Sequence, residues 1–360
     1  INAFNFPSWG LWEKAAPALL SGMPVVVKPA TATAWLTQRM VQDVINAGIL
    51  PEGALSVVCG SAQGLLDAVQ PFDVVSFTGS ADTAQKIRSH PAVLANGVRV
   101  GIEADSINSA LLMPTETADS PAVASLVREV VNEMKVKSGQ KCTAIRRIFV
   151  PEALYDTVAQ AIAAKLATLV VGDPRLENVQ MGALVNRAQY NDVKAGIAAL
   201  QQHCDTLYDG ANHPLQGVDA NACVLAPTLL GTRTPDTHPV VHHTEVFGPC
   251  ATLMPYRDLA HAVALAARGQ GALVCSIYGS DPGVMAQAAL ALAPTHGRVH
   301  AISPDVAKTH TGHGNVMPQS MHGGPGRAGG GEELGGVRAL AFYHRRSAIQ
   351  ASSAVLGAGV

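Results

Sequence analysis

The first third of the chain alternates short apolar runs with amphipathic stretches. Short apolar runs are typical of strands buried on both faces, and apolar residues three or four positions apart are typical of helices. The alternation predicts a parallel sheet covered by helices, and Gly48, Gly60 and Gly79 stand where helices or strands are expected to end. The expected strands are residues 24–28, 55–59, 74–78 and 98–103, and the expected helices are residues 33–47, 61–69 and 81–89.

The rest of the chain repeats the alternation less regularly. It predicts helices at residues 121–137, 151–170, 259–268 and 282–292, and strands at residues 147–150, 251–254, 273–279 and 297–302. Residues 310–336 are rich in glycine and histidine and are expected to form a long loop. Because 360 residues exceed the usual size of one hydrophobic core, we expect an α/β fold with two domains.

Composition narrows the classes of function. Hydrophobic residues make up 48% and charged residues 14%, as in globular proteins. A net charge of -2 without a basic run gives no electrostatic basis for binding nucleic acid or anionic membranes. No apolar run approaches the roughly 20 residues that span a bilayer, Ile1 follows no charged leader, and the six cysteines form no C-x-x-C pair. We expect a cytoplasmic protein with small-molecule partners.

Cys142 is a candidate nucleophile. It lies in a predicted glycine-containing loop between a helix and a strand, and Lys141 and Arg146 flank it. Cationic neighbours lower the pKa of a thiol and favour the reactive thiolate. The alternative is that Cys142 is a small buried hydrophobic residue, as most single cysteines are.

Two further polar residues stand at predicted strand ends. Glu103 ends an apolar strand, where it is either a solvated or ion-paired carboxylate or, if it faces a cleft, a base whose burial raises its pKa. Asn5 precedes Phe6-Pro7 and is either an ordinary turn residue or an amide donor.

Two other strand ends suit a dinucleotide. Lys28-Pro29 follows a buried strand, and ligands of open α/β sheets bind at such carboxyl ends. Thr78-Gly79-Ser80 ends another strand, and the helix that begins at Ala81 offers N–H groups to phosphate. The G-x-G-x-x-G fingerprint is absent, so each element alone is weak evidence.

Taken together, the motifs of the chain resemble those of the aldehyde dehydrogenase family, in the family's order. The matching elements are Asn5-Phe6-Pro7, the helix at residues 11–19, Val27-Lys28-Pro29, Phe77-Thr78-Gly79-Ser80, Gly139-Gln140-Lys141-Cys142-Thr143, Gly172-Asp173-Pro174, Met181-Gly182-Ala183-Leu184-Val185 and Glu245-Val246-Phe247-Gly248-Pro249. The resemblance implies a Rossmann-like cofactor domain and an α/β catalytic domain.

The resemblance also implies catalytic roles. Cys142 attacks the aldehyde, and the Asn5 amide and the Cys142 N–H stabilise the oxyanion. Glu103 activates the water that hydrolyses the thioester, and Lys14 assists. For the cofactor it implies binding by Lys28, Pro29, Thr31, Thr78, Gly79, Ser80, Glu245 and Phe247. Thr31 stands where NAD-preferring members often carry a glutamate, so we expect NADP to be preferred, with NAD as the alternative.

Departures from the family pattern bear on the substrate. Residues 104–108 read Ala-Asp-Ser-Ile-Asn where the family commonly has Leu-Gly-Gly after the glutamate, and residues 318–336 are glycine-rich. Both are similar to a subgroup that acts on CoA-linked semialdehydes in the degradation of benzoate or phenylacetate. The resemblance further implies a partial cofactor domain at residues 1–106, a catalytic domain at 107–318, and a C-terminal oligomerisation segment at 319–360. We expect a homodimer joined through a strand at 340–349, and a chain that lacks the family's N-terminal elements.

Rival functions remain. His242, His243, His310, His313 and His322 could supply a metal site, although their spacing matches no helix-borne ligand pair. An acylating enzyme would pass the thioester to CoA instead of water. A relative that kept the fold and lost activity is a third alternative, against which intact Asn5, Glu103 and Cys142 argue.

Overall fold

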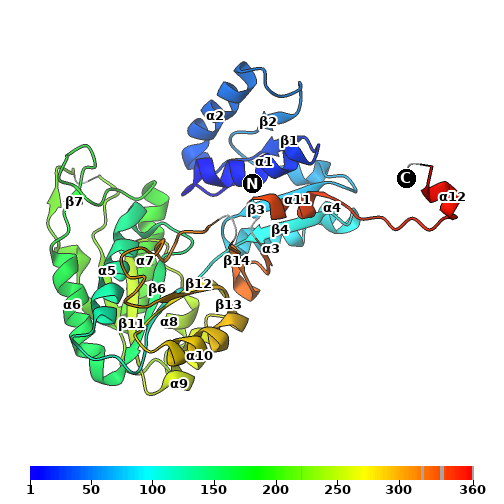
Figure 1. Cartoon of the computed structure of the whole chain (residues 1–360). Helices are drawn as coiled ribbons and strands as arrows, with labels where there is room; N and C mark the ends of the chain where they lie inside the picture. The colour runs from blue at the N-terminus through cyan, green and yellow to red at the C-terminus, as the bar shows by residue number, and fades with distance from the viewer. Residues whose placement is uncertain (220, 318–319, 333–335, 359–360) are drawn as a thin grey trace.

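The computed structural model describes residues 1–219, 221–317, 320–332 and 336–358. Figure 1 shows residues 1–103 as a blue and cyan part at the top and a larger part, green to yellow, at the lower left. The orange and red C-terminal segment runs back from the larger part to the first. No helix among the described residues is long and apolar enough to cross a membrane.

The first part contains two parallel strand pairs, each with its own helices. The strands are β1 (Val25–Val27) with β2 (Leu55–Val57), and β3 (Val74–Thr78) with β4 (Arg99–Glu103). The helices are α1 (Pro7–Leu20), α2 (Ala34–Asn46), α3 (Ala81–Arg88) and α4 (Pro91–Ala95). The predicted strands are therefore present and parallel, but the two pairs do not hydrogen-bond to each other. Ile1 and Asn2 lie between them: Thr78 N donates to Ile1 O and Asn2 N to Lys28 O.

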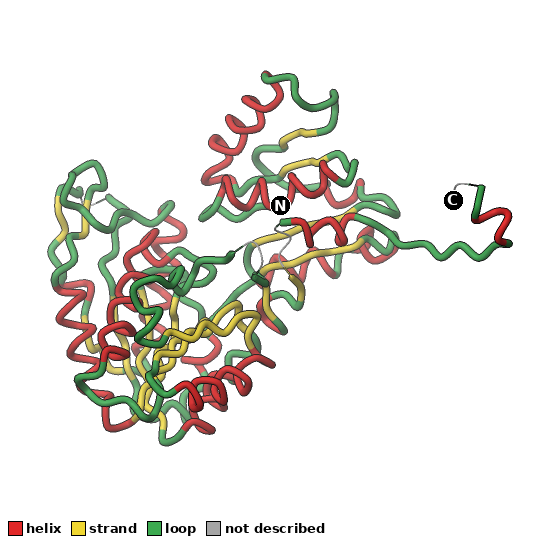
Figure 2. Tube along the Cα trace, in the orientation of Figure 1, coloured by secondary structure: helices red, strands yellow, loops and turns green. Residues whose placement is uncertain are grey.

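The larger part is built on a seven-stranded sheet with the order β13-β12-β5-β6-β11-β10-β8, parallel except for β8 (Figure 2). Helices α5 and α6 share one hydrophobic core with one face, and α7, α9 and α10 share another core with the opposite face. The strands are β5 (Asn108–Leu112), β6 (Ile145–Pro151), β8 (Asp205–Tyr208), β10 (Thr228–Gly231), β11 (Cys250–Tyr256), β12 (Ala272–Tyr278) and β13 (His296–Ile302). The helices are α5 (Pro121–Lys135), α6 (Tyr155–Ala167), α7 (Arg187–Gln201), α8 (Val240–His243), α9 (Leu259–Ala267) and α10 (Pro282–Leu292). A small pair, β7 (Val171–Gly172) and β9 (Leu215–Gln216), completes this part.

The helix predicted at residues 121–137 is present as α5 and ends at Lys135. Two other predicted elements are wrong. Residues 61–69 form no α-helix but a short 3-10 turn at Leu65–Ala68, because the stretch has no buried face on which a helix would be stabilised. The strand expected at 340–349 is absent, since Leu340–Tyr343 form the helix α11. The Phe342 ring of α11 lies against Gly101 and beneath the Arg99 guanidinium, so local packing overrides the preference for a strand.

The C-terminal segment joins the two parts. Its short strands β14 (Gly323–Gly324) and β15 (Gly331–Glu332) pair with each other. β14 lies beside β12 and β13 of the larger part, and β15 lies beside β4 of the first part. Beyond α11, α12 (Ser353–Leu356) lies away from the rest of the molecule (Figure 1).

Arg147 fixes the packing of α9 on the sheet. The side chain is 1% exposed, and its guanidinium donates to the carbonyl oxygens of Ile107 (3.1 Å), Leu265 (3.0 Å) and Ala266 (2.9 Å). The last two belong to the negative end of the α9 dipole. We expect Arg147→Leu to lower the free energy of unfolding in urea by about 3 kcal/mol or more, because these carbonyls lose their donor without gaining water.

Arg257→Leu is the matched control for this prediction. Arg257 makes an ion pair with Asp236 (3.1 Å) at the surface, with both side chains at least half exposed. Its loss should change the free energy of unfolding by no more than about 1 kcal/mol. Equal effects of the two substitutions would refute the role given to Arg147.

Candidate active site

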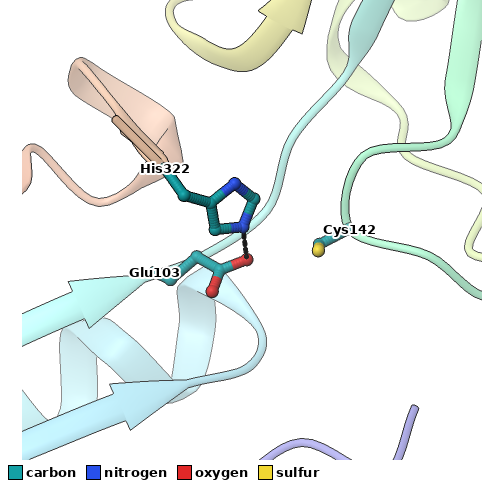
Figure 3. Close-up of side chains that lie close together, drawn as sticks. All are labelled: Glu103, Cys142 and His322. Atoms are coloured by element: carbon teal, nitrogen blue, oxygen red, sulfur yellow. Dashed lines mark ion pairs between the residues drawn. The ribbon is translucent and has the colours of Figure 1, made fainter. Parts of the chain in front are cut away.

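Glu103, Cys142 and His322 meet between the two parts of the molecule. Glu103 is the last residue of β4, Cys142 lies in the turn before β6, and His322 precedes β14 (Figure 3). Their side-chain oxygen, sulfur and nitrogen atoms all lie within 4.8 Å of one another. His322 Nε2 is 3.4 Å from Glu103 Oε1. The cluster unites two predicted catalytic residues with a histidine considered from the sequence only as a metal ligand.

A strained turn presents Cys142. Lys137 and Ser138 have φ angles of 53° and 54°, and Gly139 follows with 69°, so three successive residues adopt the left-handed conformation. Gly139 cannot be replaced without movement, since a Cβ there would lie 2.2 Å from the Gly248 carbonyl oxygen. The Arg146 guanidinium donates to both the Gly139 and the Gly248 oxygens (2.8 and 2.7 Å), which fixes the turn.

Asn108 holds the other side of the same turn. Its Nδ2 donates to the Cys142 oxygen (2.7 Å) and the Ala144 oxygen (3.1 Å), and its Oδ1 accepts from Val274 N in β12 (3.1 Å). Ser106 Oγ donates to the same Oδ1 (2.6 Å) and accepts from Leu273 N (2.8 Å). The departure at residues 104–108 thus positions the cysteine, a role that sequence reasoning missed because it depends on contacts with β12.

The prediction that cations favour the Cys142 thiolate is wrong in this structure. Lys141 Nζ pairs with Glu133 (2.7 Å), and the Arg146 guanidinium is occupied by backbone oxygens. Burial raises the pKa of the Cys142 thiol well above its usual value, and the negative charge of Glu103 raises it further. Burial also opposes ionisation of Glu103, yet His322 and Lys14 hold the pKa of that carboxyl below its usual value. At neutral pH a protonated thiol therefore faces a carboxylate.

Two hollows meet at this cluster. The first has a volume of about 310 Å³ and the second about 480 Å³. Both are lined by Ala3, Asn5, Thr78, Glu103 and Cys142. The first also contacts Phe6, Trp9, Glu13, Val316 and His322, among others. The second continues to Ala30, Gly79, Ser80, Asp105, Glu245, Phe247 and Arg327, among others. A group bound in one hollow can thus react at Cys142 with a group bound in the other.

The residues expected at the cofactor divide into two groups. Thr78, Gly79, Ser80, Glu245 and Phe247 line the second hollow. Lys28, Pro29 and Thr31 do not line it, although Ala30 between them does. Lys14 lines neither hollow and instead pairs with Glu13.

The helix N-terminus expected to hold phosphate is already partly occupied. Ala81 N donates to Asp105 Oδ1 (2.7 Å), and Thr83 N donates to Ser80 Oγ (3.3 Å). The Ala81 N–H therefore already has an acceptor in Asp105, and phosphate binding at this helix N-terminus stays a prediction. Arg327, which pairs with Asp105 (3.2 Å), is a cation of the second hollow that sequence reasoning did not single out.

The polar lining of the second hollow fits a nicotinamide cofactor. Burial raises the pKa of Glu245 to about 7 although Arg146 lies nearby. Glu245 Oε1 and Thr78 Oγ1 are buried without a hydrogen-bond partner among the described residues. Buried polar atoms normally have partners, so hydroxyl or amide groups of a cofactor suit these two atoms. The Phe247 ring, packed edge-on against Phe4 with 5.8 Å between centroids, offers an apolar contact beside them.

The five histidines do not form one site. His242 is buried against Arg147, His310 lies beside Glu129 and His313 beside Ser276. Within the described part of the chain, His322 is the histidine that lies near two other possible ligands, and those are Glu103 and Cys142.

Comparisons with known proteins agree with the geometry. A model described as the aldehyde dehydrogenase family matches residues 1–348. The 3,4-dehydroadipyl-CoA semialdehyde dehydrogenase of Aromatoleum evansii is 53% identical over 90% of this chain, and Protein MaoC of Klebsiella aerogenes is 42% identical over 49%. The chain spans 64% and 52% of the lengths of these two relatives. A solved structure of a mutant aldehyde dehydrogenase from Pseudomonas syringae with NAD+ and octanal is 25% identical, with a TM-score of 0.80 over 94% of this chain and 66% of that one.

Proposed function

Because the chain belongs to the aldehyde dehydrogenase family, we propose that it oxidises an aldehyde to a carboxylic acid through a covalent intermediate on Cys142. The observation that carries this proposal is that the Cys142 sulfur and a Glu103 carboxylate oxygen lie within 4.8 Å of each other where the two hollows meet. One hollow is assigned to the aldehyde and the other to the cofactor. The test is whether the full-length protein reduces a nicotinamide cofactor when an aldehyde is added.

The first chemical step uses the Cys142 thiol. The thiol proton passes to solvent as Sγ attacks the aldehyde carbon, so the unfavourable buried thiolate is replaced by a C–S bond. The Asn5 amide and the Cys142 N–H donate to the oxyanion that develops. A nicotinamide cofactor held in the second hollow beside Glu245 and Phe247 would supply the acceptor for the hydride of this carbon, which would leave a thioester on Cys142.

The second step hydrolyses the thioester and regenerates the free Cys142 thiol. Glu103 takes a proton from water as the water oxygen attacks the thioester carbon. The C–S bond then breaks, the acid leaves, and Cys142 recovers a proton. Glu103 favours water over CoA as the acceptor. Product analysis with and without CoA separates hydrolysis, which gives the free acid in both cases, from acyl transfer, which gives a CoA thioester only when CoA is present.

The substrate proposed is a CoA-linked semialdehyde. The relative with 53% identity is named for 3,4-dehydroadipyl-CoA semialdehyde, so we propose this compound, and the oxo-dehydrosuberyl-CoA semialdehyde of phenylacetate degradation is the alternative. The lining of the first hollow includes the apolar side chains of Phe6, Trp9 and Val316, which suit the carbon chain of such an aldehyde. Comparing kcat/KM for the two semialdehydes, with octanal as the CoA-free reference, decides among them.

The cofactor proposed is NADP, on the grounds that Thr31 carries no charge that would repel a 2′-phosphate. We expect kcat/KM to be higher with NADP than with NAD. Thr31→Glu should lower the ratio of kcat/KM with NADP to kcat/KM with NAD by about tenfold or more. The reason is that like charges placed together cost on the order of 1.4 kcal/mol at such exposed sites. The exposed neighbour Ala32 provides the control: Ala32→Glu should change the ratio much less. A wild-type preference for NAD would contradict the proposal.

The domains proposed for the chain correspond to the two parts of the structure. We place the cofactor domain at residues 1–106 and the catalytic domain at 107–318, with residues 319–360 as the returning segment. The boundary at 318/319 lies outside the described residues. A cytoplasmic homodimer remains the proposed state, and sedimentation of the full-length protein tests the dimer.

A further inference from the structure

His322 reaches the active site from a segment whose path is fixed by close backbone contacts. It directly precedes Gly323, whose φ of 145° lies in the region that favours glycine. The Gly323 oxygen passes so close to Gly297 of β13 that a Cβ at Gly297 would lie 1.7 Å from it. The next residue, Gly324, accepts a hydrogen bond from Gly330 N (2.9 Å). The backbone that directly follows His322 is therefore anchored against the sheet of the catalytic part.

The ring approaches Glu103 across the gap between the two parts. Its Nε2 lies 3.4 Å from Oε1, and the side chains are only 10% and 4% exposed (Figure 3). The other charged or titratable groups around this carboxylate come from different elements. Glu13 and Lys14 belong to α1 and are paired with each other, and Cys142 belongs to the nucleophile turn.

We propose that His322 is a positioning residue for the hydrolytic step, which keeps the Glu103 carboxylate charged and aimed at the carbon bonded to Cys142 Sγ. This inference rests on the proposed function. His322 forms no bond to substrate in this step. The water proton goes to Glu103, the water oxygen bonds to the thioester carbon, and the electron pair of the C–S bond returns to Cys142.

The physical reason is the cost of a buried carboxylate. Glu103 is 5% exposed, and burial favours its neutral form, which is no base. Lys14 offsets part of this cost but is itself paired with Glu13. A hydrogen-bond donor or positive charge at His322 offsets the rest of the cost of burying the Glu103 carboxylate. Without it, the pKa of Glu103 should rise.

The test uses His322→Ala and His322→Gln in the full-length enzyme, with octanal or the CoA-linked semialdehyde as the aldehyde. His322→Ala should keep a rapid burst of about one reduced cofactor per active site. Its steady-state turnover should then be at least about tenfold slower than that of the wild type. This loss is smaller than the 10²–10⁴-fold rate enhancement that a general base typically provides, because Glu103 is still present. The acid limb of the kcat profile should move to higher pH. His322→Gln, which retains a hydrogen-bond donor, should recover part of the rate. Mass spectrometry should detect the accumulated acyl-enzyme.

His310→Ala is the matched control. His310 also lies beside a buried glutamate, with Nε2 3.8 Å from Glu129 Oε2, and both side chains are 8% exposed, but it lines neither hollow. Its loss should leave the burst, the turnover and the pH profile unchanged. An unshifted acid limb in His322→Ala, or equal loss of burst and turnover, would overturn the inference. A wild-type enzyme that reduces no cofactor with any aldehyde would instead overturn the proposed function.

Discussion

Cys142→Ala is expected to reduce turnover by about 10⁴-fold or more, to the level without enzyme, because the substitution removes the sulfur that forms the covalent intermediate. Folding should be little affected. The side chain is small, and the backbone of the turn is fixed by Asn108 and Arg146 rather than by the sulfur. The measurement is cofactor reduction with aldehyde, together with circular dichroism to show that the fold is kept.

The control for this substitution is an exposed cysteine. Cys59 lies on the surface after β2, outside both hollows, so Cys59→Ala should retain full activity. Activity that survives in Cys142→Ala, or that disappears in Cys59→Ala, is incompatible with the assigned nucleophile.

Glu103→Gln is expected to have two effects in opposite directions. Steady-state turnover should fall by about 10²–10⁴-fold because the base for hydrolysis is lost. Alkylation of Cys142 by iodoacetamide at pH 7 should become faster, since the negative charge that raises the pKa of the thiol is removed and the thiolate fraction grows. The two rates are measured by cofactor reduction and by mass spectrometry of the alkylated peptide.

Glu13→Gln is the control that separates the role of Glu103 as a base from the general effect of removing a negative charge near Cys142. Glu13 also lines the first hollow and raises the pKa of Cys142, but it ranks below Glu103 in that effect and pairs with Lys14. It should accelerate alkylation less and should keep most of the turnover. If Glu103→Gln slowed both alkylation and turnover, Glu103 would not be the group that keeps the thiol protonated.

Hydrophobic patterning predicted strands from their apolar runs. β11 and β12 are nearly unbroken apolar runs and are buried at every position, whereas the apolar runs of β1 and β3 are only partly buried and Val26 is exposed. β5 was missed although it is fully buried, because it begins with Asn108 and Ser109, which look like loop residues. Their polar groups serve contacts that only the fold creates.

The residues of the candidate site that belong to local sequence motifs could be predicted from the sequence. Cys142, Glu103 and Asn5 were found from the sequence, and the structure brings them to the lining of the same two hollows. The protonation of Cys142 was not predictable, since sequence neighbours Lys141 and Arg146 turn to other partners. His322 was considered only as a rival metal ligand, because its approach to Glu103 joins β4 to a glycine-rich segment far along the chain.

The most direct test of the covalent mechanism is the mass of the full-length Glu103→Gln enzyme after mixing with octanal and NADP or NAD. The proposed chemistry predicts an acyl adduct, heavier by the aldehyde less two hydrogens, on the peptide that contains Cys142, with about one reduced cofactor formed per adduct. Cofactor reduction without any adduct, or an adduct on another residue, would contradict it.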